Sequence, residues 1–124
     1  MELRTKESGD VVVLSPLGRI DHTNCDHFLA AIQPRVDRCS AGGVRVVFDL
    51  SELEYISSAG LRCFLMAAKQ VKPRGGTVAV AAMSPVVREI FEISRFHLVF
   101  PTFATLQEAV AQLSPGARSA QDRP

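Results

Sequence analysis

The segment that most constrains the fold of this chain is a valine-rich run, VRVVFDL, at positions 44–50. It is apolar without clean alternation, which is typical of a central strand that is covered on both faces. A second apolar run, TVAVAAM, follows at 77–83. Between the two, four apolar residues recur at the spacing of a helix face: Leu61, Phe64, Leu65 and Ala68. A buried strand, a helix and another buried strand predict a parallel sheet packed against helices.

The N-terminal part of the chain predicts a hairpin and a helix. The hairpin pairs Leu3–Lys6 with Val11–Leu17 across the turn-like ESGD, and a proline inside the second strand suggests an edge or a bulge. The helix runs from Thr23 onward, with Asp21 or Thr23 as the N-cap, and Pro34 should kink or shorten it.

The C-terminal part predicts two more helices and one more strand. Ser84 followed by Pro85 is an N-cap with proline at the first helical position. HLVF at 97–100 is expected to be a short last strand, and Thr105 with Glu108 forms a capping box that opens a final helix.

The expected order of elements is therefore β-β-α-β-α-β-α-β-α: one α/β domain with a mixed, mainly parallel sheet and helices mainly on one side. The domain should span 1–113, and the polar, Pro/Gly-rich residues 114–124 should be a disordered tail. The periodicities place seven residues in the core: Val46, Phe48, Leu61, Leu65, Val78, Val80 and Ile90.

Composition narrows the classes of function. The 124 residues suit one domain, and 14 Lys and Arg against 13 Asp and Glu give no basic face for nucleic acid. No apolar run reaches the roughly 20 residues of a membrane span, so we expect no membrane contact and a cytoplasmic location. Three cysteines without a CxxC pair and three histidines without ligand spacing predict no disulfide, no metal and no cofactor.

The junction YISSAGLR at 55–62 carries more polar and small residues than a structural junction needs. Capping of the following helix would explain one serine, and it remains the simplest interpretation of the segment taken alone. Capping does not explain the second serine or Gly60, because glycine inside a helix costs about 1 kcal/mol relative to alanine. The chain contains neither GxSxG nor a phosphate-binding glycine motif, so a serine hydrolase is the least favoured interpretation. We expect a non-enzyme whose hydroxyl is read or modified by another protein.

Three segments resemble the STAS domain, and specifically the small single-domain anti-sigma factor antagonists of bacteria. They are GRIDHTNCDHF at 18–28, VVFDLSELEYISSAGLR at 46–62 and GGTVAVAAMSPVVREIFEISRF at 75–96. The resemblance covers residues 3 to 113. It implies that the unmodified protein binds an anti-sigma factor serine kinase of the histidine-kinase-like ATPase fold and thereby frees a sigma factor. Phosphorylation of a serine at the start of the second helix ends this binding, and a PP2C-type phosphatase restores it.

The resemblance places that serine at Ser58, because Ser57 stands where the family commonly has an aspartate. Ser57 remains the alternative. Asp21 matches the acidic residue of the loop beside this turn. The partner-binding surface implied by the resemblance comprises Asp21, His22, Thr23, Ser57, Ser58, Ala59, Gly60, Leu61 and Arg62. An alternative with the same fold is a non-catalytic STAS subunit of a larger assembly, such as a lipid-transport complex or a stressosome-like scaffold.

Overall fold

The two N-terminal strands form an antiparallel hairpin in the computed structural model, which describes residues 2–113. Strand β1 (Leu3–Ser8) pairs with β2 (Val11–Pro16), and Gly9 in the turn has a φ of 63°. A positive φ is favourable for glycine because it has no Cβ. The predicted hairpin is confirmed, with a first strand that extends two residues further than expected.

Parallel strands continue the sheet from the hairpin. They are β4 (Arg45–Asp49), β6 (Val78–Ala81) and the short β7 (Thr102–Phe103), and the strand order is β1-β2-β4-β6-β7. The strand predicted from VRVVFDL is therefore β4, at the centre of the sheet.

Helices cover both faces of this sheet, three on one side and one on the other. Helices α1 (Cys25–Val36), α2 (Ser58–Val71) and α3 (Pro85–Ile93) pack on the first face, and α4 (Leu106–Leu113) packs on the second. Val46 and Phe48 of β4 point into the larger core and Val47 into the smaller one. Alternation along an extended strand explains this division, and the expected α/β architecture is confirmed.

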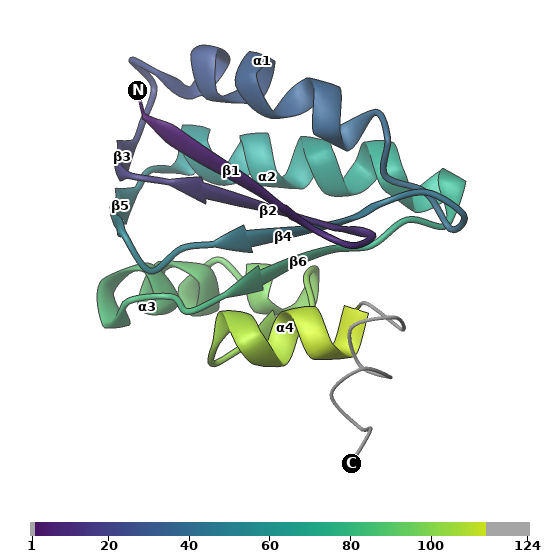
Figure 1. Cartoon of the computed structure of the whole chain (residues 1–124). Helices are drawn as coiled ribbons and strands as arrows, with labels where there is room; N and C mark the ends of the chain where they lie inside the picture. The colour runs from purple at the N-terminus through teal and green to yellow at the C-terminus, as the bar shows by residue number, and fades with distance from the viewer. Residues whose placement is uncertain (1, 114–124) are drawn as a thin grey trace.

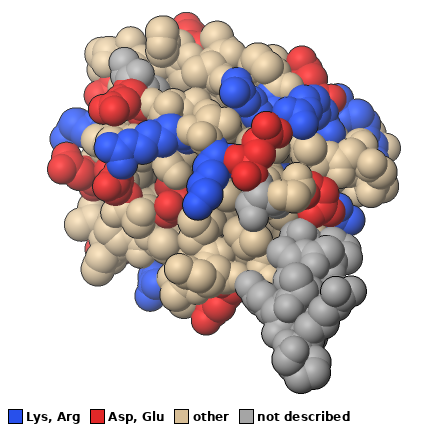
Figure 2. Space-filling view, viewed as in Figure 1, with Lys and Arg blue, Asp and Glu red and all other residues tan. Residues whose placement is uncertain are grey.

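Five of the seven predicted core residues are buried: Val46, Phe48, Leu61, Val78 and Val80. Leu65 and Ile90 are only partly buried, so their assignment to the core was too strong. No helix within the described residues is long and apolar enough to cross a membrane. Basic and acidic side chains are intermixed on the face seen in Figure 2.

A separate two-stranded parallel sheet was not predicted. It consists of β3 (Gly18–Ile20) and β5 (Leu53–Ile56), which lie together at one end of the domain (Figure 1). Three and four residues are too few for periodicity to distinguish a strand from a loop. This small sheet leads directly into the segments that start α1 and α2.

The predicted strand at 97–100 is wrong. Residues Phe96–Leu98 form a 3-10 turn, η2, which Arg95 enters with a φ of 61°, and the last strand is β7 instead. Phe96 and Phe100 are four residues apart and both pack against Phe91, with ring centroids 6.3 Å apart in each pair. A helical turn brings residues at this spacing onto one side, so aromatic packing determines the local backbone.

Helix caps were predicted with mixed success. Ser84 accepts a hydrogen bond from the Val87 amide, and Thr105 accepts one from the Glu108 amide, as expected. The N-cap of α1 is Asn24 rather than Asp21 or Thr23, and its side chain does not cap the helix. That side chain is held by two other partners in the preceding loop. Pro34 lies in the last turn of α1, which ends two residues later.

Candidate functional site

The candidate site lies where α1 and α2 begin, beside the small sheet. Figure 1 shows the two helices side by side and starting at the same end of the molecule, next to β3 and β5. The amide of Ser57 donates to the carbonyl of Ile20 at 2.9 Å, which ties the start of α2 to the loop that precedes α1. Two segments more than 30 positions apart in the sequence therefore form one continuous turn region.

The two serines of this turn have different roles. Ser57 is the N-cap of α2, and its hydroxyl accepts a hydrogen bond from the Gly60 amide at 3.3 Å. Ser58 is the first residue of the helix, and its side chain is exposed and makes no hydrogen bond with any described residue. Capping thus accounts for Ser57, and the hydroxyl of Ser58 remains available to solvent and to partners.

Gly60 allows the start of α2 to approach the small sheet closely. A Cβ atom at this position would lie 2.7 Å from Cγ1 of Ile56, 2.8 Å from Cγ2 of Ile20 and 3.0 Å from the Ile20 carbonyl oxygen. Both isoleucines are buried and cannot move away easily. The glycine is therefore required for packing. This requirement explains why a residue of low helix propensity stands in the first turn of α2.

The loop of Asp21, His22 and Thr23 forms the second half of the site. The Thr23 hydroxyl and the Thr23 amide both donate to Oδ1 of Asp21, the amide at 2.9 Å. Hydrogen bonds to the ionised form stabilise it, and they lower the pKa of the Asp21 carboxyl below its ordinary value. Asn24 holds the loop from within, since its side chain accepts from the Asp21 amide and donates to the Arg19 carbonyl, each at 2.9 Å.

The residues expected to bind a partner are brought together, but they are not equally accessible. His22, Thr23, Ser58 and Arg62 are exposed, whereas Asp21, Ser57 and Ala59 are half-buried. Gly60 is buried and Leu61 is 4% exposed in the larger core. Gly60 and Leu61 therefore hold the turn in place through buried packing and are not part of its exposed surface.

Sequence reasoning missed three features around the small sheet and the helices near it. The Arg19 guanidinium lies over the Tyr55 ring, 4.6 Å from its centroid, where β3 and β5 pair. The thiol of Cys63 donates to the Cys25 carbonyl at 3.3 Å, and burial raises the pKa of this thiol to about 11. Val86 at the start of α3 is 54% exposed. Only Val86 had a sequence signal, as an apolar residue two positions after a helix cap.

The hydroxyls of Ser57 and Ser58 make no hydrogen bond with a histidine or a carboxylate among the described residues. An activated serine nucleophile needs such a base within hydrogen-bond reach. The geometry instead offers a free hydroxyl at a helix N-terminus on an exposed turn.

Comparison with known proteins gives this arrangement a family. A sequence model described as the STAS domain matches residues 2–109. The chain belongs to the STAS domain family. A protein from Bordetella bronchiseptica named as an anti-sigma factor antagonist, BtrV, is 38% identical over 111 residues, covering 90% of this chain and 92% of that protein. On this basis the chain is placed among the anti-sigma factor antagonists of the STAS family.

Solved STAS structures have the same fold. An anti-sigma factor antagonist from Thermotoga maritima superposes with a TM-score of 0.81 at 20% identity, covering 90% of this chain and 93% of that one. The anti-sigma factor antagonist SpoIIAA in its unphosphorylated form gives a TM-score of 0.73 at 21% identity, covering 90% and 95%. SpoIIAA of Bacillus in its phosphorylated form gives 0.66 at 20% identity, covering 90% and 98%.

Proposed function

We propose that this protein is an anti-sigma factor antagonist whose unphosphorylated form binds an anti-sigma factor serine kinase, and that phosphorylation of Ser58 ends the binding. The observation that carries the proposal is the difference between the two serines of the turn. Ser57 caps α2, while the Ser58 hydroxyl is exposed and makes no hydrogen bond with a described residue. The name of the Bordetella relative and the existence of unphosphorylated and phosphorylated structures of SpoIIAA support it.

A phosphate on Ser58 should be tolerated by the fold. The N-terminus of a helix carries a partial positive charge and free amide groups, and both stabilise a negative group there. The hydroxyl is exposed, so the added group displaces no packed side chain. The modification should therefore act on the interface with the partner.

The size of the electrostatic effect is sufficient for a switch. A phosphate carries nearly two negative charges at neutral pH. Two added charges about 6 Å from a partner carboxylate, at an effective dielectric constant of about 20 to 40, oppose binding by about 3 to 5 kcal/mol. That change corresponds to roughly a hundred-fold to several thousand-fold in affinity before salt screening. A PP2C-type phosphatase would remove the phosphate and restore binding.

The protein should act by binding alone. By binding the anti-sigma factor, the protein would compete with the sigma factor and so release it. This chain's own residues would make or break no covalent bond. Purified protein should therefore hydrolyse neither esters nor nucleotides, and an activity lost in a single point variant would contradict this.

Binding titrations of serine variants against the cognate kinase test the proposal. Ser58→Ala should bind within about threefold of the wild type, because the lost hydroxyl makes no intramolecular hydrogen bond. Ser58→Asp should bind more weakly, although less weakly than the phosphorylated protein, since it carries one charge instead of nearly two. Ser51→Asp adds the same charge at an exposed position outside the expected partner-binding surface and should leave the affinity unchanged. Wild-type affinity for Ser58→Asp would overturn the assignment, and no binding by the unmodified chain would favour a role in a larger assembly.

A further inference from the structure

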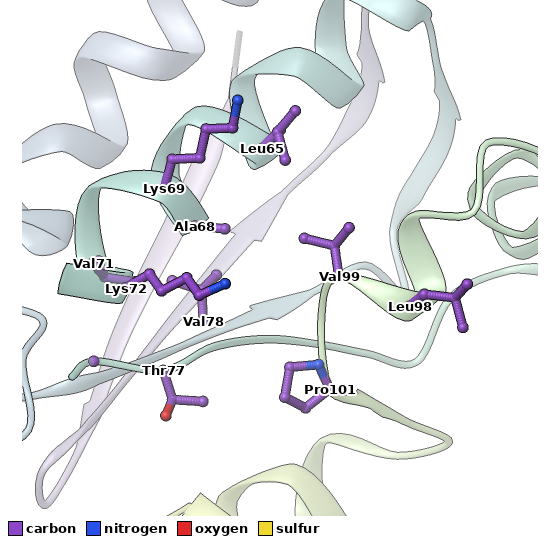
Figure 3. A pocket seen from close by; sticks show the side chains of 11 residues that line it. Leu65, Ala68, Lys69, Val71, Lys72, Thr77, Val78, Leu98, Val99 and Pro101 are labelled. Carbon is purple, nitrogen blue, oxygen red and sulfur yellow. The ribbon is translucent and has the colours of Figure 1, made fainter.

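A groove lies between the C-terminal half of α2 and the segment that follows η2 (Figure 3). Its volume is about 530 Å³, which falls in the range of small-molecule sites. Apolar side chains from three parts of the chain form its walls: Leu65, Ala68, Val71, Val78, Leu98, Val99 and Pro101. Leu98 and Val99 remain 71% and 46% exposed. Exposed apolar side chains beside a hollow are a feature of binding surfaces.

The charged groups of the groove are all positive. Lys69 and Lys72 belong to its lining, and no acidic residue does. The ammonium group of neither lysine forms an ion pair or a hydrogen bond with any described residue. In Figure 3 the Lys72 side chain extends over Val78 toward the space that faces Val99. The Lys72 ammonium thus lies beside the apolar floor, whereas the Lys69 ammonium points away from it at the upper rim (Figure 3).

The end of α2 does not account for these two charges. A helix C-terminus carries about half a negative charge, which offsets only part of the two ammonium groups. Two carbonyls at this end also accept backbone hydrogen bonds, because the Gly76 amide donates to Val71 and the Gly75 amide donates to Lys72, both at 3.0 Å. The two lysine side chains cap neither of these carbonyls, so their charge is available to a ligand.

We propose that this groove binds a single-chain amphiphile with an anionic head group, such as a carboxylate or a sulfate on an alkyl chain. The alkyl chain would lie on the floor around Val78 and Val99, and the head group would bind the ammonium group of Lys72, with Lys69 adding a second positive charge at the rim. Burial of the alkyl chain favours binding, and the charged head fixes the orientation. The site is separate from the serine turn, since Ser58 and Lys72 lie at opposite ends of a helix about 20 Å long.

Titration of the intact protein with decanoate, followed by amide chemical shifts in NMR below the micelle concentration, tests this site. Saturable shifts are expected at Gly76, Thr77, Leu98 and Val99, and not at the serine turn. Decyltrimethylammonium has the same chain and the opposite charge, and it should bind at least tenfold more weakly.

Charge variants separate specific binding from general attraction. Lys69→Gln combined with Lys72→Gln should weaken decanoate binding at least tenfold, because both positive charges of the groove lining are removed. Lys6→Gln combined with Arg88→Gln removes the same charge from exposed positions outside the groove and should leave the affinity unchanged. Equal binding of the two head groups, shifts confined to other surfaces, or an absence of saturation would overturn the proposal. A folded Val99→Asp variant that binds decanoate normally would do the same.

Discussion

The Gly60 amide donates a hydrogen bond to the hydroxyl of Ser57, at 3.3 Å. This single bond makes two adjacent serines chemically different, because one hydroxyl is committed to the helix and the next is free. A family resemblance alone left the choice between them open. The local geometry supplies the reason to prefer Ser58 as the modified residue.

The loss of the Ser57 cap should lower stability, whereas loss of the Ser58 hydroxyl should not. Ser57→Ala removes a capping acceptor, which typically costs about 1 kcal/mol and about 3 to 5 °C in Tm for a domain of this size. Ser58→Ala changes an exposed side chain and should stay within about 0.5 kcal/mol of the wild type. Thermal or urea unfolding of both variants measures the difference. Equal losses would mean that the two hydroxyls are not distinguished in this way.

Gly60→Ala should destabilise the protein despite the better helix propensity of alanine. The new methyl group would meet Ile56, Ile20 and the Ile20 carbonyl at 2.7 to 3.0 Å, and such overpacking costs about 1 to 3 kcal/mol. Gly42→Ala is the control, since nothing lies within 4 Å of a Cβ at that position. Chemical denaturation compares the two, and a stabilised Gly60→Ala protein would contradict the close approach described above.

The pKa of Asp21 should rise when its hydroxyl partner is removed. Thr23→Val deletes the side-chain hydrogen bond and keeps the backbone one, so the pKa should move toward the ordinary value without reaching it. An NMR titration of the Asp21 carboxyl carbon measures this. Because the folded pKa is lowered, the stabilisation is present above the unfolded pKa and is lost as the pH falls through the folded one. An unchanged pKa in the variant would show that the threonine hydroxyl does not act on the carboxylate.

Cys63 should react slowly with alkylating reagents. Its thiol is 4% exposed, and burial raises its pKa from 9.0 to about 11. At pH 8 the thiolate fraction is then about 100-fold lower than that of an unperturbed cysteine, before any steric protection. Cys25, which is half-buried, should be labelled first. Timed iodoacetamide labelling followed by peptide mass spectrometry gives the order, and faster labelling of Cys63 would contradict its burial.

The long elements were predictable because their signals are repeated many times. Five residues of β4 and fourteen of α2 carry enough apolar pattern to define a strand and a helix. The small sheet of β3 and β5 has no such redundancy, since each strand exists only because the other is beside it. HLVF was mistaken for a strand because packing of Phe96 and Phe100 on Phe91 overrides local propensity.

The start of α2 was predictable, and the details of the candidate site around it were not. YISSAGLR combines capping residues with the beginning of an apolar helical repeat, so the sequence was sufficient to locate this helix start. The assignment of Asn24 as the N-cap of α1 depends on the carbonyl of Arg19 and the amide of Asp21, whose positions follow from tertiary structure. Nothing in the sequence indicated the groove beside Val99, because its walls come from α2, β6 and the segment after η2.

Phosphate mapping tests the central claim most directly. The wild-type protein and the Ser57→Ala and Ser58→Ala variants would be incubated with the cognate anti-sigma factor kinase and ATP, then analysed by intact mass and fragment spectra. We predict one phosphate on the wild type and on Ser57→Ala, located at Ser58, and none on Ser58→Ala. A phosphate located at Ser57, or equal phosphorylation of the Ser58→Ala variant, would contradict the account.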